Sequence, residues 1–218
     1  MVWLRYLIIA VVAYFLGNFS SGVLISKWVG HTDIREHGSG GTGATNMLRT
    51  LGWFPSVMTL LGDALKAALA ALFGKMVGGE IGMLIGGVAA IVGHNWPVLF
   101  GFHGGKGIAA SLGMLLVCSP WIGLILLAQE IIIIAITRYV SVASIIAAVT
   151  LPVYTVLFYP HDTPRLIASV VVALLALFSH RANIARLIRN NENRLDFHKI
   201  HDVSVQYDIT KQKKRDRK

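Results

Sequence analysis

Residues 121–137 read WIGLILLAQEIIIIAIT, an apolar run long enough to cross a lipid bilayer as a helix. Similar runs cover most of the chain, at about residues 3–26, 53–74, 81–99, 107–118, 141–159 and 164–180. Of the 218 residues, 55% are hydrophobic and only 14% are charged, which is more apolar than a water-soluble domain. The pattern predicts an all-α membrane protein with seven transmembrane helices, of which residues 107–118 form a short one.

The first of these stretches also resembles a secretory signal peptide. Arg5 precedes its apolar core, and Ser20, Ser21 and Gly22 are small residues of the kind found at cleavage sites. Because apolar sequence continues past them to Ile25, we expect this stretch to remain in the mature protein as a helix.

The distribution of lysine and arginine predicts how the chain is oriented. If the C-terminal tail is cytoplasmic and seven helices alternate, the internal segments are residues 27–52, 100–106, 138–140 and 181–218, and they hold 16 of the 20 basic residues. Basic residues concentrate in the cytoplasmic segments of membrane proteins. We therefore expect an external N-terminus, a cytoplasmic C-terminus and all the polar motifs described below on the cytoplasmic face.

The first polar motif is a glycine-rich loop, GSGGTGATN, at residues 38–46. Its four glycines can bring backbone N–H groups against an anion, and they are Gly38, Gly40, Gly41 and Gly43. Thr45 or Asn46 can cap the helix that follows, whose N-terminal amides also attract negative charge. Ser39 adds a hydroxyl group and Arg49 a guanidinium that can bind phosphate through two hydrogen bonds. The motif predicts a phosphate-binding loop, and a flexible linker is the alternative interpretation.

The second motif, GHNWPVLFGFHGGKGIAAS, occupies residues 93–111. Glycines on both sides of Lys106 let its ammonium and the local backbone approach the same phosphate, and these glycines are Gly104, Gly105 and Gly107. The motif differs from a Walker A loop both in its glycine spacing and in the residue that follows the lysine. It therefore does not indicate a nucleotide hydrolase.

Two further motifs place polar side chains at helix ends. If TRYVSVAS, residues 137–144, is one helix, Thr137, Ser141 and Ser144 share a face that either binds substrate or packs against another helix. In SHRANIARLIR, residues 179–189, His180 and Asn183 are three residues apart and face the same way. An imidazole there can orient or deprotonate a hydroxyl group near neutral pH. The arginines of this motif are predicted to face anionic lipid, and they are Arg181, Arg186 and Arg189.

Charged residues inside the apolar stretches have a simpler interpretation. Asp63 and Lys66 are three residues apart, and we expect them to pair because isolated charge is costly in a membrane. Glu130 receives no catalytic role, since the sequence indicates no partner for it. The single cysteine, Cys118, excludes an internal disulfide, and no His, Asp and Glu cluster has the spacing of metal ligands. We therefore expect no metal and no cofactor.

The order and spacing of these motifs resemble those of the bacterial acyl-phosphate:glycerol-3-phosphate acyltransferase family. The motifs that carry the resemblance are GSGGTGATN followed by MLRTLG, GHNWPVLFGFHGGKGIAAS, TRYVS and HRANIARL. The resemblance extends to about residue 195. It implies a multi-pass enzyme of the bacterial inner membrane with seven transmembrane helices. Such an enzyme transfers a fatty acyl group from acyl-phosphate to position 1 of glycerol 3-phosphate, which gives lysophosphatidic acid and phosphate. A nucleic-acid partner is not expected, and the sequence does not indicate an oligomeric state.

The chain departs from the family pattern at two positions. Gly41 stands where the family's glycine loop usually has asparagine, so an amide that might contact phosphate is missing. At position 103 the family commonly has a basic residue, whereas this chain has His103, whose charge depends on pH.

From the motifs and the resemblance we predict two sets of site residues. The predicted catalytic residues are Ser39, Arg49, Lys106, His180 and Asn183. The predicted substrate-binding residues are Gly38, Gly40, Gly41, Gly43, Thr45, Asn46, Gly104, Gly105, Gly107, Ser141 and Ser144. The general base is either His180 or a phosphate of the substrate, and covalent acylation of Ser39 is disfavoured because no histidine and acid pair lies beside it in the sequence.

Two other classes of function remain as alternatives. The same loops can form the binding site of a transporter or channel for a phosphorylated solute, although the sequence has no evident internal repeat. The second alternative is a scaffold protein whose basic tail binds acidic partners or lipid. We divide the chain into a membrane acyltransferase domain, residues 1–195, and a basic cytoplasmic tail, residues 196–218, and we expect catalysis to survive removal of the tail.

Overall fold

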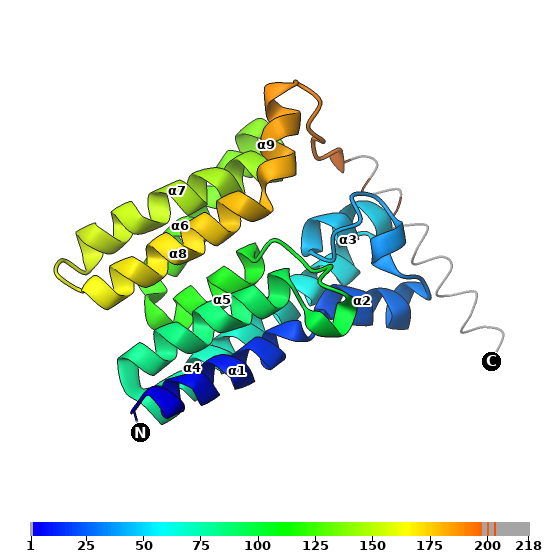
Figure 1. Ribbon diagram of the computed structural model, residues 1–218. Coiled ribbons are helices and arrows are strands. Elements are labelled where there is room, and N and C mark those ends of the chain that lie inside the picture. The colour runs from blue at the N-terminus through cyan, green and yellow to red at the C-terminus, as the bar shows by residue number, and fades with distance from the viewer. Residues whose placement is uncertain (1, 198–199, 201–202, 204–218) are drawn as a thin grey trace.

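The computed structural model describes residues 2–197, 200 and 203, and every regular element among them is a helix (Figure 1). Three short elements are a π-helical turn, η1, and two 3₁₀ turns, η2 and η3. In chain order the elements are α1 (Val2–Asn18), α2 (Ser21–Ile25), η1 (Ser26–Gly30), η2 (Ile34–Glu36), α3 (Ala44–Leu51), α4 (Trp53–Asn95), η3 (Val98–Phe100), α5 (Ile108–Cys118), α6 (Pro120–Thr137), α7 (Val140–Phe158), α8 (Thr163–Ser179) and α9 (Arg181–Ile188).

Each predicted apolar stretch is mainly helical, with breaks at residues 19–20 in the first stretch and 96–97 in the third. By length and apolar composition, four helical segments could each cross a membrane, and a fifth is added if α8 and α9, bent by 57° relative to each other, count as one span. Helix α5 is shorter, with 11 residues, as the sequence indicated. An all-helical, multi-pass arrangement is therefore established for the described residues, while seven spans remain a prediction.

Helix α4 contains two predicted spans because its chain reverses direction at Gly79. The φ angle of Gly79 is 65°, a left-handed conformation that an L side chain rarely adopts. On either side of the reversal, Gly74 lies against the backbone of Gly82, and Gly86 lies against the backbone of Ala70. The two halves of α4 thus run antiparallel in close contact, and the absence of side chains at these positions permits that approach.

The same kind of small-residue contact attaches α1 and α5 to α4. Gly17 of α1 lies against the backbone of Ala90, and Gly113 of α5 lies against the backbone of Ala64. Helices α6, α7 and α8 form a second group that lies beside α5 in Figure 1, with contacts from α5 to α6 and from α4 to α8. These two groups form the walls between which the polar motifs are positioned.

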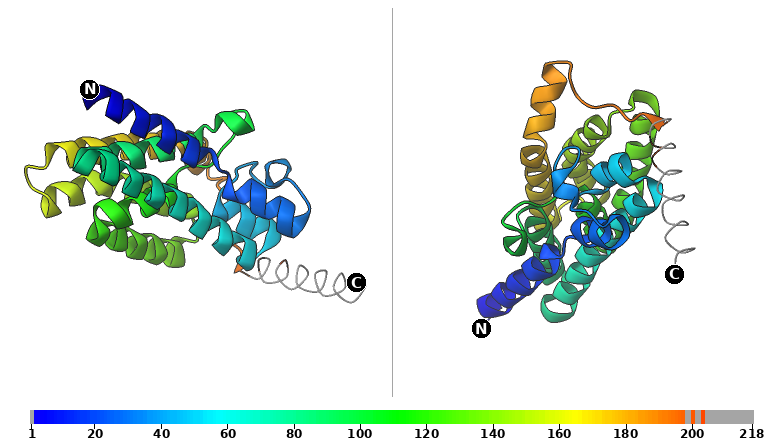
Figure 2. Two further views of the ribbon diagram at one scale, coloured as in Figure 1. Left: turned by 90° about the horizontal axis from the view of Figure 1, so that it is seen from below. Right: turned by 90° about the vertical axis from the view of Figure 1, so that its right-hand side faces the viewer.

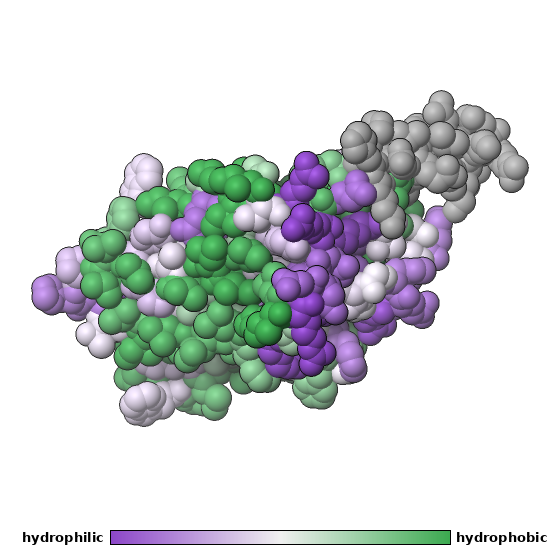
Figure 3. Space-filling view, turned by 90° about the horizontal axis from the view of Figure 1, so that it is seen from above, coloured by the Kyte–Doolittle hydropathy of each residue, from purple (hydrophilic) through white to green (hydrophobic). Residues whose placement is uncertain are grey.

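The molecular surface has a broad apolar zone. Figure 3 shows hydrophobic residues across the middle of one face and hydrophilic residues mainly at its two ends, most densely at one of them. Side chains such as Ile131, Val153, Ile167 and Leu174 are exposed on the outside of the helices. Such a surface is stable in lipid and costly in water, which agrees with a multi-pass membrane protein.

Candidate active site

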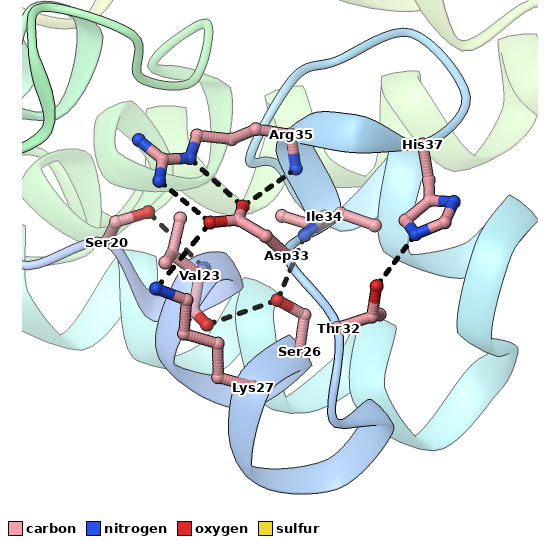
Figure 4. Close-up of polar contacts among 9 residues, drawn as sticks. All are labelled: Ser20, Val23, Ser26, Lys27, Thr32, Asp33, Ile34, Arg35 and His37. Atoms are coloured by element: carbon pink, nitrogen blue, oxygen red, sulfur yellow. Dashed lines mark hydrogen bonds and ion pairs between the residues drawn. The ribbon is translucent and has the colours of Figure 1, made fainter.

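The segment that leads into the glycine loop is fixed by a small network between η1 and η2 (Figure 4). The Ser26 hydroxyl donates to the carbonyl of Val23 at 3.1 Å and accepts from the backbone N–H of Ile34 at 3.2 Å. The carboxylate of Asp33 accepts from the backbone N–H of Arg35 and pairs with its guanidinium at 2.7 Å. The hydrogen bond from Arg35 outweighs desolvation and lowers the pKa of Asp33, so this anchor is ionised at neutral pH.

Asn46 holds the glycine loop itself in place. Its side-chain amide donates to the carbonyls of Ile34, His37 and Gly41 at 3.2, 2.9 and 2.9 Å, and its Oδ1 accepts from the backbone N–H of Ser39 at 3.0 Å. The expectation that Thr45 or Asn46 caps helix α3 is wrong, because α3 begins at Ala44, before both residues, and Gly43 is its N-cap. Asn46 therefore shapes the loop instead of capping the helix.

Gly38 is required by this arrangement. Its φ angle is 60°, and a Cβ atom at this position would collide with Oδ1 of Asn46. The sequence interpretation assigned the loop glycines to close contact with an anion. At Gly38 the structure gives another physical reason, which is the tight turn around the Asn46 amide.

The second glycine motif packs against the end of α4. Gly105 donates its backbone N–H to the carbonyl of His94 at 3.1 Å, and Cβ atoms at Gly104 or Gly105 would overlap His94. Gly107 has a φ angle of 82° and precedes the first residue of α5. The turn thus holds Lys106 between two closely packed backbone segments.

Beneath this turn lies a buried charge cluster. Lys66 Nζ is 2.8 Å from Asp63 Oδ1 and 2.8 Å from His94 Nδ1, and it donates to the carbonyl of Phe19 at 2.5 Å. The predicted pairing of Asp63 with Lys66 is confirmed. His94 was quoted within its motif without a role, and the structure adds it as a third member, 3.4 Å from the Asp63 carboxylate.

Lys106 is the first member of a chain of hydrogen-bonded side chains that extends from the turn before α5 to the segment after α9. Its Nζ donates to Oδ1 of Asn183 at 2.6 Å, and the Asn183 amide donates to Oε1 of Glu192 at 2.8 Å. Burial lowers the pKa of Lys106 to about 8, despite the nearby Glu192 carboxylate, while Arg186 and Arg49 lower it further. The ammonium is therefore charged at neutral pH but loses its proton more easily than an ordinary lysine.

Glu192 accepts hydrogen bonds from three side chains of two helices, α7 and α9. Besides Asn183, it accepts from the Ser141 hydroxyl at 3.1 Å and from Nε of Arg186 at 2.7 Å. Burial raises the pKa of Glu192, but these hydrogen bonds and the charge of Arg186 outweigh that effect and lower it. The prediction that Arg186 faces lipid is wrong, because its guanidinium pairs with this buried carboxylate.

His180 occupies the bend between α8 and α9. Its Nδ1 lies 2.8 Å from the carbonyl of Ala176, so Nδ1 carries the proton and Nε2 is the basic nitrogen of the neutral ring. The side chain is 3% exposed and lines the cavity described below. This geometry suits a group that accepts a proton or a hydrogen bond from a bound hydroxyl group.

Arg49 projects from α3 and is half-buried. Its Nη2 donates to the backbone carbonyl of Asn193 at 3.1 Å, while its buried Nε has no hydrogen-bond partner within the described part of the chain. Burial lowers the pKa of Arg49, although Glu192 opposes the effect, and a guanidinium remains charged at neutral pH after such a shift. A donor without a partner inside a cavity is available to an anion.

These motifs meet around one cavity of about 330 Å³. All the predicted catalytic residues line it, namely Ser39, Arg49, Lys106, His180 and Asn183. So do most of the predicted substrate-binding residues, namely Gly41, Gly43, Thr45, Asn46, Gly105, Gly107, Ser141 and Ser144. Gly38, Gly40 and Gly104 are not part of the lining. The first two lie in the turn that supports the loop, and Gly104 packs against His94.

The hydroxyl stripe predicted for residues 137–144 does not form as one helix. Helix α6 ends at Thr137, Arg138 has a φ angle of 62°, and α7 begins at Val140. The Thr137 hydroxyl donates to the carbonyl of Ile133 within α6. Ser141 and Ser144 still share a face of α7 and reach the cavity, whereas Thr137 does not.

Several cavity residues were not predicted from the sequence to belong to the site. They are Ser56, Asp63, His94, Glu130, Arg186 and Glu192. Glu192 lies nine positions after Asn183, beyond the motif that drew attention, and only its pairing with Arg186 in space identifies it. A search for an acidic residue near a cluster of predicted cytoplasmic arginines could have suggested it. Among the residues that the structure describes, no group of three His, Cys, Asp or Glu side chains could hold a metal ion.

Comparison with known proteins identifies the family. A family model described as glycerol-3-phosphate acyltransferase matches residues 7–190. The chain belongs to the glycerol-3-phosphate acyltransferase family. Relatives named glycerol-3-phosphate acyltransferase include one from Thermoanaerobacter sp. (strain X514), 42% identical over 85% of this chain and 93% of the relative. Another, from Clostridioides difficile (strain 630), is 41% identical over 87% of this chain and 95% of the relative.

Solved structures of a family member agree with this assignment. The glycerol 3-phosphate form of PlsY (YgiH), an integral membrane glycerol 3-phosphate acyltransferase, has a TM-score of 0.83 and 34% identity, covering 89% of this chain and 98% of that chain. Its lysophosphatidic acid form has a TM-score of 0.81 and 32% identity, over 89% of this chain and 97% of that chain. The protein is thus a multi-pass membrane member of a family of acyltransferases, and acylation of glycerol 3-phosphate belongs to phospholipid biosynthesis.

Proposed function

We propose that this protein transfers a fatty acyl group from acyl-phosphate to the sn-1 hydroxyl of glycerol 3-phosphate, which yields lysophosphatidic acid and inorganic phosphate. The observation that carries the proposal is the convergence of Arg49, Lys106, His180 and Asn183 on one cavity. These residues come from α3, the turn before α5, and the α8–α9 bend, so only the folded chain brings them together.

The cavity is lined by residues of two chemical kinds, which we call its polar and apolar sides, and this supports an amphipathic substrate. Its polar side contains the cations, the hydroxyl groups and the glycine turns. Its apolar side contains Leu48, Trp53, Leu60, Ile108, Ile134, Val140, Leu195 and Phe197. An acyl-phosphate has a charged head and a long apolar chain, so each side offers a matching environment for one part of it.

On this proposal the two phosphates occupy different parts of the polar side. Glycerol 3-phosphate is held by Arg49, Lys106, Ser141, His180 and Asn183. The head of acyl-phosphate is held by Ser39 and Thr45 of the glycine loop together with the turn at residues 104–107. Nε of Arg49, which has no hydrogen-bond partner among the residues that the structure describes, and the ammonium of Lys106 supply the positive charge that two adjacent anions require.

The reaction needs positioning more than strong acid catalysis. The sn-1 oxygen attacks the acyl carbon and forms an ester bond, the bond between that carbon and the phosphate oxygen breaks, and phosphate leaves with the electron pair. Because the phosphate is a good leaving group, holding the two substrates in contact supplies most of what is needed, about 7–11 kcal/mol in favourable cases. The nearby cations stabilise the negative charge that develops on the acyl oxygen.

The proton of the sn-1 hydroxyl has two possible acceptors. Nε2 of His180 is the basic nitrogen of a ring whose Nδ1 is held by a backbone carbonyl. The departing phosphate of the donor is the other acceptor and lies next to the reacting oxygen by the nature of the reaction. The proton is accounted for in both routes, since it ends on the imidazole in one and on the released phosphate in the other.

We further propose that the chain crosses a bacterial inner membrane seven times, with an external N-terminus and a cytoplasmic C-terminus. The concentration of basic residues in the proposed internal segments supports this orientation. The boundary at residue 195 between the membrane domain and the tail stays a proposal. Truncation after residue 195, with catalysis expected to survive, tests this boundary, and it removes Phe197, which lines the cavity, and Ile200, which is buried.

The decisive experiment uses the purified protein with glycerol 3-phosphate and either acyl-phosphate or acyl-CoA. Phosphate release and formation of lysophosphatidic acid are measured together. We expect both products in equal amounts with acyl-phosphate. Activity with only the thioester would overturn the proposed donor, and acylation at the sn-2 position, detected by analysis of the product, would overturn the proposed acceptor.

A further inference from the structure

The segment after α9 forms part of the cavity lining through Glu192, Leu195 and Phe197. We name residues 191–197 the C-terminal strap. Figure 2 shows it, in orange, leaving α9 and passing toward the helices drawn in green. The family model ends at residue 190, so the strap lies beyond the part of the chain that it matches.

Hydrogen bonds tie the strap to both sides of the cavity. The carbonyl of Asn193 accepts from Arg49 of α3, and the backbone N–H of Leu195 donates to the carbonyl of Arg138 between α6 and α7 at 2.8 Å. The guanidinium of Arg194 lies 4.8 Å from the ring centroid of Tyr139. Helix α3 packs against α4 of the first helix group, and the α6–α7 turn belongs to the second, so the strap connects the two groups.

The strap also contributes apolar side chains to the cavity. Leu195 is 5% exposed and packs with Leu48 and Ile200, with Ile134 and Val140 beside them. Phe197 lines the same cavity and remains 44% exposed. An aromatic ring that is half covered by a cavity wall leaves apolar surface available to a bound chain.

A smaller cavity of about 40 Å³ offers another route for the chain, deeper among α5–α8. It shares only Ile108 and Glu130 with the larger cavity. Oε1 of Glu130 is buried without a hydrogen-bond partner among the described residues. Methylene groups placed against this oxygen would prevent its hydration, which is unfavourable. The side formed by Leu195 and Phe197 imposes no such cost.

We propose that Leu195 and Phe197 of the C-terminal strap contact the acyl chain of the donor next to its head group and thereby determine which acyl chains are used. This inference rests on the proposed function and adds specificity residues to the same site. The strap contributes both polar and apolar groups to the cavity. Glu192, near its start, binds polar side chains such as Ser141, and Phe197, at its end, adds apolar surface.

The test compares Phe197→Ala and Leu195→Ala with the unaltered protein, using acyl-phosphates of increasing chain length. We expect the KM for the donor to rise about fivefold and the preference among chain lengths to change. The KM for glycerol 3-phosphate should be unchanged, because its proposed site is polar. Phe197→Leu, which keeps an apolar side chain, should recover most of the affinity for the donor.

Two matched control variants distinguish loss of contact with the acyl chain from general destabilisation of the protein. Leu112→Ala makes the same truncation as Leu195→Ala in the smaller cavity, and Ile188→Ala truncates an apolar side chain of α9 that is 77% exposed. Neither control should change the chain-length profile. Because Phe197 is half exposed, its variant should fold even if Leu195→Ala does not.

The outcomes distinguish failure of this inference from failure of the proposed function. If the unaltered protein releases phosphate from acyl-phosphate but Phe197→Ala has the same donor KM and chain-length profile, the strap does not contact the chain. A changed profile in Leu112→Ala, with none in Phe197→Ala, would place the chain in the smaller cavity and overturn the inference. Absence of transfer by the unaltered protein would instead contradict the proposed function.

Discussion

Nζ of Lys106 donates to Oδ1 of Asn183 at 2.6 Å, and the amide nitrogen of Asn183 in turn donates to Glu192 at 2.8 Å. The oxygen of the Asn183 amide thus contacts the Lys106 ammonium, and its nitrogen contacts the Glu192 carboxylate. This arrangement fixes the direction of the amide and holds the ammonium at the cavity wall. It links the second glycine motif to α9, although 77 residues separate the two partners.

Asn183→Asp tests the need for an amide at this position. The substituted carboxylate loses the donor to Glu192 and lies beside it, so two negative charges repel each other and also repel a substrate phosphate. We expect kcat/KM for glycerol 3-phosphate to fall about 100-fold, which corresponds to roughly 3 kcal/mol. Steady-state kinetics check this result. Asn191→Asp, the same change at an exposed position outside the cavity, should retain normal kinetics, and equal losses in both variants would contradict the assigned contact.

The pH dependence of activity tests the charge of Lys106. Its pKa is lowered to about 8, so the ammonium is present below that pH and is lost as the pH rises through it. We expect kcat/KM, which reports the free enzyme, to decrease above about pH 8 by up to tenfold per pH unit. In Lys106→Arg the guanidinium stays charged, so this decrease should disappear even if the maximum rate is lower. A decrease of the same shape in both proteins would assign it to another group.

Glu192→Gln tests how much the buried carboxylate stabilises the fold. The substitution preserves size but weakens the contacts with Ser141, Asn183 and Arg186, and we expect a loss of about 1–3 kcal/mol. Thermal unfolding in detergent should show a lower apparent Tm. Glu80→Gln is a control, because Glu80 is 59% exposed and surface pairs contribute little. Similar Tm values for the two variants would contradict a stabilising role for Glu192.

The lowered pKa of Glu192 also predicts the sign of a pH effect on stability. A carboxyl group whose pKa is lower in the folded state contributes its stability above its unfolded pKa and loses it as the pH falls through the folded pKa. The difference in Tm between the unaltered protein and Glu192→Gln should therefore be largest at neutral pH and become smaller at acidic pH. A difference that is independent of pH would mean that the ionised form is not responsible.

Lys66→Met tests the buried cluster beneath the second glycine motif. Removing the ammonium leaves the Asp63 carboxylate buried with only His94 nearby, and we expect destabilisation of about 3–5 kcal/mol. Thermal unfolding again provides the measurement. Lys75→Met removes an exposed partner of Glu80 and should have little effect. The double variant Asp63→Leu and Lys66→Met should recover part of the loss, and no recovery would argue against the charge as its cause.

Much of the fold could be predicted from the sequence because membrane helices have a strong one-dimensional signal. Each apolar stretch corresponds to helical residues, and the short fourth stretch is the short helix α5. Local geometry was harder to anticipate. The break at Arg138 separates Thr137 from Ser141, and no apolar pattern marks a residue that adopts a left-handed conformation.

The candidate site was predicted in part, for a related reason. Residues within short polar motifs stand out, and Ser39 and Lys106 in the glycine-rich motifs and Asn183 in SHRANIARLIR were predicted in this way. Glu192 and Arg186 depend on contacts made in three dimensions, since an arginine that faces lipid and one that pairs with a buried carboxylate look the same in the sequence. The loop also shows that a motif can be located correctly and explained differently, as Asn46 shapes the backbone where helix capping was expected.

His180→Ala separates the two possible proton acceptors. If Nε2 of His180 removes the sn-1 proton, its loss should lower kcat at saturating substrates by about 10²–10⁴-fold. If the donor phosphate accepts the proton, the main effect should be a higher KM for glycerol 3-phosphate, with kcat reduced less than tenfold. His180→Gln adds a second measurement, because its amide can form hydrogen bonds but is not a base. Recovery of activity by glutamine and not by alanine would assign His180 to substrate orientation, whereas equal loss of kcat in both variants would assign it to proton transfer.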